Sequence, residues 1–97
     1  MKLTAADARV FVTEGLLSAD LEDHEEAIEN YDKALQIVQF AEIYLNKGIS
    51  LVELERFEEA LECYDKATAL EPNDSLLWYI KGVVLSDLKI RRCDNKL

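Results

Sequence analysis

The fold is decided by residues 41–74, AEIYLNKGISLVELERFEEALECYDKATALEPND. Apolar side chains recur every three or four residues on both sides of a short polar break at Glu55-Arg56. This spacing is typical of amphipathic helices, and it predicts one helix over residues 41–54 and a second over residues 57–70. Pro72 then ends the second helix, because proline cannot continue the backbone hydrogen-bond ladder. The stretch therefore predicts a helix–turn–helix unit.

The same pattern occurs again on both sides of this unit. An offset of 33 residues pairs Phe11 with Tyr44, Gly15 with Gly48, Leu21 with Leu54, Glu26-Ala27-Ile28 with Glu59-Ala60-Leu61, and Tyr31-Asp32-Lys33-Ala34 with Tyr64-Asp65-Lys66-Ala67. An offset of 34 residues pairs Tyr44 with Trp78, Gly48 with Gly82, and Leu54 with Leu88. Self-similarity at this period is the signature of a helical solenoid, in which each unit buries its apolar face against the next.

The second copy resembles the tetratricopeptide motif. The residues that carry the resemblance are Tyr44, Gly48, Leu51, Phe57, Ala60, Tyr64, Ala67 and Pro72. Residues 8–40 resemble another copy, one residue shorter, with Gln39 at the place of the proline and His24 at the place of an aromatic residue. Residues 75–88 resemble only the first helix of a third copy, and residues 89–97 form a basic tail. The resemblance implies a single all-α domain over residues 1–97, a right-handed stack of about five helices in antiparallel pairs.

Three glycines lie inside the predicted helices, where each costs about 1 kcal/mol relative to alanine. We expect Gly15, Gly48 and Gly82 to let a partner helix approach closely, with the small side chains of Ala27 and Ala60 at the meeting point. Bulky aromatic residues are then expected to fill the layers between the helix pairs. These residues are Phe11, Tyr31, Tyr44, Tyr64 and Trp78.

The junction over residues 37–43 contains no proline, glycine, asparagine or aspartate. Nothing local therefore forces a break between the first and second copies. The resemblance implies an ordinary turn near Gln39-Phe40, and we favour that interpretation. The alternative is one long helix over residues 24–54, which would splay the units apart and favour a domain-swapped dimer.

The overall charge narrows the range of partners. Eleven basic and twenty acidic residues give a net charge of −9, which argues against nucleic acid and against anionic membrane surfaces. Met1-Lys2-Leu3-Thr4 leads directly into an amphipathic segment without a secretory signal pattern. Cys63 and Cys93 are far apart and lack metal-ligand spacing, so we expect reduced thiols and a cytoplasmic location.

The resemblance also implies a concave face lined by the first helix of each copy. The residues expected to form a peptide-binding groove there are Val12, Leu16, Leu45, Asn46, Ile49, Val52, Tyr79, Ile80 and Val83. Members of the family that grip the acidic C-terminal tails of heat-shock proteins carry Lys or Arg and Asn at five places of this face. Here those places hold Val12, Leu16, Asn46, Leu76 and Ile80. Because only Asn46 matches, we predict no carboxylate clamp and expect instead an apolar peptide or an amphipathic helix of a protein partner.

Residues 75–88 are apolar on nearly all sides, and a helix of this kind is usually buried on more than one side. Its usual partner helix is missing from the pattern, so a second copy of the chain is the simplest cover. The candidate residues for such an oligomer interface are Leu77, Val84, Leu85 and Leu88. A homodimer that uses the apolar faces is therefore the alternative to a groove for a foreign peptide.

No pattern of catalytic, cofactor-binding or metal-binding residues is recognisable. His24 is the single histidine, and it takes the place of an aromatic residue, which predicts a half-buried packing role. Cys63 would need a nearby base to act as a nucleophile, and His24 lies one repeat away. We therefore predict a protein that is not an enzyme and that needs no cofactor.

Overall fold

The computed structural model describes residues 3–94, with side chains as far as Lys89. This part of the chain forms five helices and no strand. The helices are α1 (Ala5–Asp20), α2 (His24–Leu35), α3 (Ala41–Glu53), α4 (Phe57–Leu70) and α5 (Ser75–Asp94). The prediction of an all-α helical repeat is confirmed.

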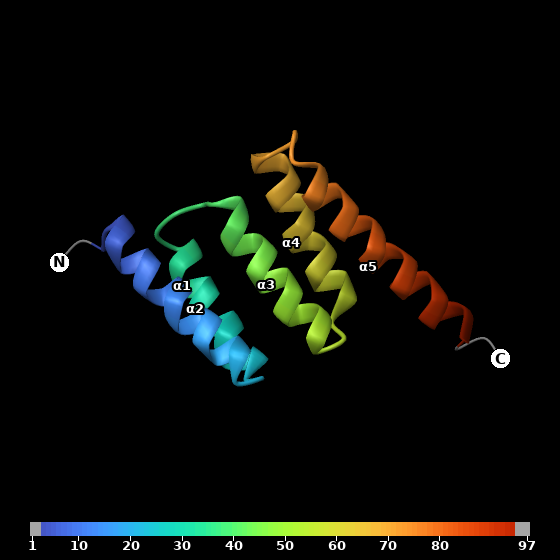
Figure 1. Ribbon diagram of the computed structural model, residues 1–97, viewed down its shortest axis with the longest axis horizontal. Helices are drawn as coiled ribbons and strands as arrows, with labels where there is room; N and C mark the ends of the chain where they lie inside the picture. Colours follow the sequence, from blue (N-terminus) through green and yellow to red (C-terminus); the bar gives the residue numbers. More distant parts are fainter. Residues whose placement is uncertain (1–2, 95–97) are drawn as a thin grey trace.

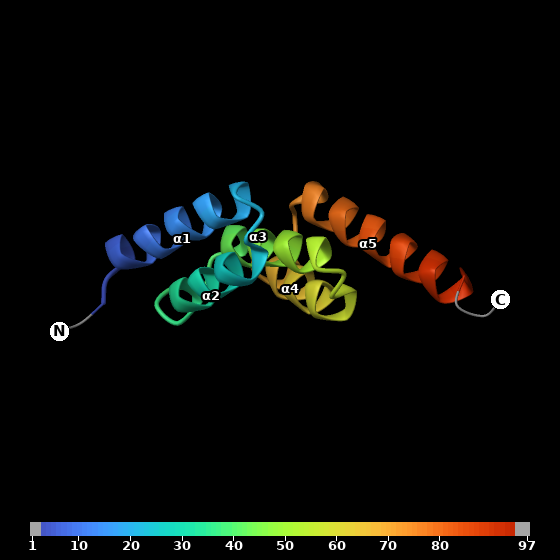
Figure 2. The ribbon, with the colours of Figure 1, turned by 90° about the horizontal axis from the view of Figure 1, so that it is seen from below.

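The helices are arranged as two hairpins followed by one additional helix (Figure 1). Helix α1 pairs with α2 and α3 pairs with α4, while α2 packs on α3 and α4 packs on α5. Helices α1, α3 and α5 form one layer, and α2 and α4 form the other (Figure 2). The result is an elongated stack that measures 55 × 31 × 18 Å.

Both hairpins turn through the same backbone motif. The N–H of Asp23 donates to the carbonyl of Ser18 at 2.8 Å, and the N–H of Glu22 donates to Ala19 at 2.9 Å. This pair of bonds is a Schellman motif, in which the residue after the helix adopts a left-handed conformation. Glu22 has φ 63°, and Glu55 takes the equivalent place in the second hairpin with φ 61°. Glycine usually occupies this position, so the two glutamates hold a strained conformation.

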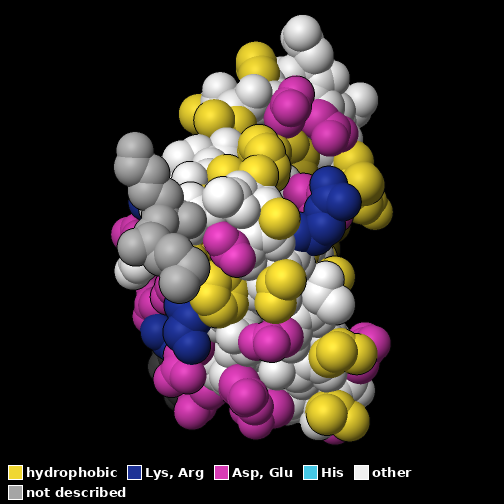
Figure 3. Space-filling view, turned by 90° about the vertical axis from the view of Figure 1, so that its left-hand side faces the viewer, with side chains coloured by type: hydrophobic (Ala, Val, Ile, Leu, Met, Phe, Trp, Pro, Cys, Tyr) yellow, Lys and Arg dark blue, Asp and Glu magenta, His cyan; other side chains and the backbone are white. Residues whose placement is uncertain are grey.

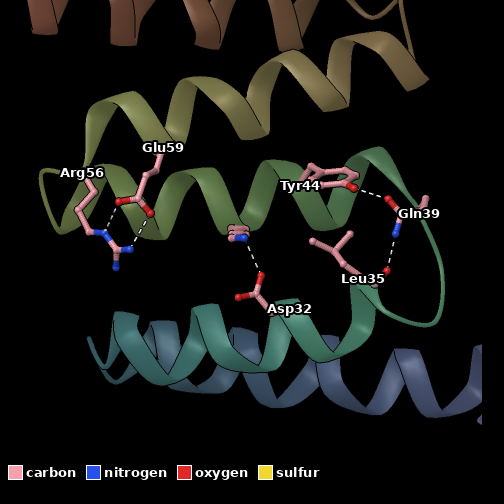
Figure 4. Close-up of polar contacts among 7 residues, drawn as sticks. Asp32, Leu35, Gln39, Tyr44, Arg56 and Glu59 are labelled. Carbon is pink, nitrogen blue, oxygen red and sulfur yellow. Dashed lines mark hydrogen bonds and ion pairs between the residues drawn. The ribbon is translucent and has the colours of Figure 1, made fainter.

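The junction between the hairpins is a turn over residues 36–40, as predicted, and the alternative of one helix over residues 24–54 is wrong. The side chain of Gln39 holds the turn from inside (Figure 4). Its amide nitrogen donates to the carbonyl of Leu35, and its amide oxygen accepts from the hydroxyl of Tyr44. Gln39 therefore ties the end of α2 to the first turn of α3, at the place where the motif expects proline.

The glycines are explained by aromatic rings. A Cβ atom on Gly15 would lie 2.5 Å from Cε1 of Tyr31, and one on Gly48 would lie 2.5 Å from Cε1 of Tyr64. Both tyrosines are almost fully buried. The close approach was predicted, but the group that needs the space is a tyrosine ring. Apart from the backbone of its own helix, a Cβ atom on Gly82 would meet no atom within 4 Å, because the described residues provide no helix that pairs with α5 as α4 pairs with α3.

Trp78, the last of the five aromatic residues expected to fill the layers, departs from the prediction for the same reason. Phe11, Tyr31, Tyr44 and Tyr64 are buried or half-buried, whereas Trp78 is half exposed. Its indole N–H donates to the carbonyl of Pro72 at 2.9 Å, and Lys81 lies over its ring. The expectation that Trp78 fills a layer between helix pairs is therefore wrong. Helix α5 also continues past residue 88 to Asp94, so it includes the first part of the predicted basic tail, and residues 95–97 lie outside the described part.

Candidate interaction surfaces

The layer of α1, α3 and α5 carries a row of equivalent apolar side chains. Leu16, Ile49 and Val83 occupy the same place in the three helices, and their exposed fractions are 43%, 44% and 43%. The near-identical exposure follows from the repeat, because each side chain stands at the same angle on its helix. All three members of this row are among the residues predicted for the groove, and they form a line of partly exposed apolar side chains along the layer.

The hollow that gathers most of the predicted groove residues lies between α3 and α5. Its volume is about 320 Å³. We call it the α3–α5 hollow, and it is lined by Ile49, Val52, Glu53, Tyr64, Tyr79, Ile80, Val83, Val84 and Asp87. Five of the nine predicted groove residues meet here. The lining is apolar with two carboxylates, Glu53 and Asp87, which the sequence analysis did not include.

The other predicted groove residues lie elsewhere. Val12 lines a second hollow of about 360 Å³ between α1 and α3, together with Val38, Phe40 and Ile43. Leu45 lines a third, of about 640 Å³, between the turn at residues 39–40 and the start of α5. Leu16 and Asn46 line none of these three hollows. The structure therefore divides the predicted groove into separate hollows.

Phe40 is the residue of this layer that sequence reasoning missed. It is 58% exposed and lines both the second and the third hollow. It was treated only as part of a turn, although an aromatic residue in an exposed turn is a common feature of binding surfaces. The sequence did not reveal that Phe40 is exposed, because the repeat pattern does not specify the conformation of the turn.

Matched ion pairs join successive hairpins. Nζ of Lys47 in α3 lies 2.6 Å from the carboxylate of Asp32 in α2 (Figure 4). Lys81 in α5 lies 2.5 Å from Asp65 in α4, which is the same contact one repeat later. Burial favours the neutral amine of Lys47, but the hydrogen bond and charge of Asp32 outweigh it and raise the pKa of Lys47. Each pair marks the seam where the first helix of one repeat meets the second helix of the repeat before it.

Two of the predicted oligomer-interface residues belong to the core. Leu77 and Val84 are each only 3% exposed, because this side of α5 packs on α4. Their assignment to a free face is therefore wrong. Leu85 is 47% exposed and Leu88 is half-buried, and the exposed side of α5 also carries Leu76, Trp78, Tyr79 and Val83.

The two residues considered for chemistry lie in packing positions. His24 is half-buried, and its Nδ1 lies 3.4 Å from the hydroxyl of the buried Ser50. Cys63 is buried, and this burial raises the pKa of its thiol. A raised pKa lowers the fraction of thiolate at neutral pH, which is unfavourable for a nucleophile. Among residues 3–94 no helix is long and apolar enough to cross a membrane.

Comparison with known proteins places this arrangement in a family. Models of the tetratricopeptide repeat match residues 8–37 and residues 41–74, which together make up more than half of the chain. No curated protein matched the sequence. The two matched segments cover the two hairpins apart from the first three residues of α1, and they include Gly15 and Gly48, each packed against a tyrosine ring. The chain therefore belongs to the tetratricopeptide repeat family, whose repeats generally bind protein partners and are non-catalytic.

Proposed function

We propose that this protein binds an apolar peptide, or one face of an amphipathic helix, in the α3–α5 hollow. The observation that supports this most is the meeting of five exposed or half-exposed apolar side chains in one depression, namely Ile49, Val52, Tyr79, Ile80 and Val83. Concave, mostly apolar sites with few polar groups are the usual form of a ligand site. Helices laid in such a groove use apolar side chains at helical spacing as anchors.

The charges around the hollow favour a partner with basic flanks. Glu53 and Asp87 stand on the two helices that form its walls. Among the residues whose side chains the structure describes, as far as Lys89, no Lys or Arg lines it. A peptide with an acidic C-terminal tail would meet carboxylates and apolar groups here. Of the five positions that form the carboxylate clamp in other members of the family, only Asn46 holds a matching residue. An apolar segment flanked by Lys or Arg is the complementary ligand.

The test is a selection of peptides from a phage-displayed library of random linear sequences on the immobilised protein. Affinities of the selected peptides are then measured for the wild type and three variants. Ile49→Glu and Val83→Glu put a carboxylate into the hollow, and we expect each to weaken binding by about tenfold or more. Leu70→Glu is the matched control, because Leu70 is 44% exposed, as Ile49 is, but lies at the end of α4 outside the α3–α5 hollow. Equal affinity of all four proteins would refute the assignment of the hollow.

A second candidate, a homodimer formed through the outer side of α5, is favoured by one observation. The face of α5 that contains Trp78, Gly82 and Leu85 corresponds to the face of α3 that α4 covers. Leu85 is 47% exposed, whereas its equivalent Leu51 is 1% exposed. Light scattering behind size exclusion decides this candidate. A mass of twice 11.1 kDa that falls to the monomer value in Leu85→Glu supports it, and a monomer at all concentrations refutes it.

A further inference from the structure

The outward side of α1 carries an apolar surface that the proposed groove does not use. We call it the α1 end face, and define it by Val10, Glu14, Leu17 and Leu21. Val10 is 54%, Leu17 58% and Leu21 81% exposed. Beside Val10 the surface is hollowed by about 600 Å³, lined by Ala5, Ala6, Arg9, Val10, Thr13 and Glu14. Figure 3 views the molecule from this end and shows hydrophobic side chains interspersed with carboxylates.

The other two helices of the layer use the equivalent face to pack on the preceding hairpin. In α5 the equivalents of Val10 and Leu17 are Leu77 and Val84, and both are buried against α4. In α3 the equivalent of Val10 is Ile43, which is also buried. In α3 and α5 this face is therefore covered by the helix that precedes it. Helix α1 has the same face with apolar residues, and no described residue covers it.

The central charge of this face is reversed in α1. In α3 and α5 the position between the apolar residues holds Lys47 or Lys81, each paired with an aspartate of the helix that covers it. In α1 the same position holds Glu14, which is exposed and forms no ion pair with another described residue. Arg9, at the edge of the hollow, is the one cation among the described residues that lines it. A helix that covers the α1 end face must therefore present a cation where α2 and α4 present Asp32 and Asp65.

We propose that the α1 end face docks an amphipathic helix of a partner protein, with Lys or Arg opposite Glu14. Helices α2 and α4 of a second copy do not fit the requirement. They carry Asp32 and Asp65 at the matching place, and both carboxylates are already paired with lysines. Two copies of α1 related by a twofold axis near Glu14 would bring two carboxylates together, which is unfavourable. The charge of Glu14 thus selects a basic helix.

The α4 sequence supplies a probe, because α4 already packs on the equivalent face of α5. Two synthetic peptides contain residues 56–71 with Cys63→Ala, held helical by a lactam bridge on the exposed side, since short helices are only marginally stable in water. One peptide keeps Asp65, and the other carries Asp65→Lys. Binding is followed through the amide NMR signals of α1 in the full protein. We expect the Asp65→Lys peptide to bind about fivefold more tightly, as an exposed ion pair allows.

The charge-reversed protein is the decisive control. Glu14→Lys is expected to reverse the preference, so that the peptide with Asp65 binds more tightly. Leu17→Glu is expected to abolish the shifts of the α1 signals, and Ile49→Glu, which disables the α3–α5 hollow, to leave them unchanged. The proposal is overturned if neither peptide shifts the α1 signals, or if both bind equally to the wild type and to Glu14→Lys. It is also overturned if the α1 signals shift when the protein alone is concentrated, because a second copy would then be the occupant.

Discussion

Replacing Gly48 with alanine places a methyl group where the Tyr64 ring already lies. The new Cβ would be 2.5 Å from Cε1 and 2.9 Å from Cζ of that ring. Both separations are well below the roughly 3.5–4.0 Å at which carbon atoms pack favourably. Tyr64 is 1% exposed, so its ring is packed on nearly all sides and has little room to move.

The size of the effect follows from two opposing terms. Overpacking of a well-packed core costs about 1–3 kcal/mol, and the enclosed ring argues for the upper part of this range. Alanine regains about 1 kcal/mol through its higher helix propensity. We therefore expect Gly48→Ala to lower the free energy of unfolding by about 1–2 kcal/mol. Gly82→Ala is the matched control, because no atom lies within 4 Å of its Cβ and only the favourable term, at most about 1 kcal/mol, applies.

Urea unfolding followed by circular dichroism measures both variants. With a denaturant slope of about 2 kcal/mol/M, the middle of the usual range, the midpoint of Gly48→Ala should fall by about 0.5–1 M. The midpoint of Gly82→Ala should stay level or rise. The reasoning is refuted if Gly48→Ala is as stable as the wild type, or if the two variants shift in the same direction by the same amount.

Three further predictions concern the turns, the tyrosines and the seams. Glu22→Gly should raise the free energy of unfolding by about 0.5–1 kcal/mol, because glycine adopts φ 63° without strain; thermal unfolding measures this, and a lower melting temperature would contradict it. Burial raises the pKa of Tyr64 from 10.0 to about 12, so the unfolded chain ionises first and stability should fall between these pH values. Absorbance of tyrosinate against pH tests this, and full ionisation near pH 10 without unfolding would contradict it. Lys47→Met should cost at most about 1 kcal/mol, since Asp32 is half exposed in the pair; a loss of several kcal/mol in urea unfolding would show that the pair contributes more than an exposed ion pair.

The helix pattern was predictable because it depends on spacing alone. The two periodic segments around Glu55-Arg56 predicted α3 and α4 to within a residue of their ends. The turn over residues 36–40 was predicted only from the resemblance, because no residue there breaks a helix by itself. The side chain of Gln39 stabilises the turn by bonding to Leu35 and Tyr44, four and five residues away. Glutamine is not one of the residue types that mark a turn in a sequence, so this role could not be predicted.

The orientation of α5 was less predictable. A helix that is apolar on nearly all sides gives no indication of which side its neighbour covers. Leu77 and Val84 were therefore assigned to a free face, although the offset of 34 residues aligns Leu77 with the buried Ile43. Trp78 was expected to be buried because its equivalents Phe11 and Tyr44 are covered by their own hairpins. Helix α5 has no such hairpin among residues 3–94, and the pattern of one helix does not reveal the absence of the next.

The most direct test of the proposed function is methyl NMR of the protein with a peptide selected on it. If the α3–α5 hollow is the binding site, the methyl signals of Ile49, Ile80 and Val83 should shift together as the peptide is added. The methyl signals of Leu17 on the far side of α1 should stay in place. Shifts confined to Leu85 or to the α1 end face, with Ile49 and Val83 unchanged, would contradict the account and move the peptide site away from the hollow.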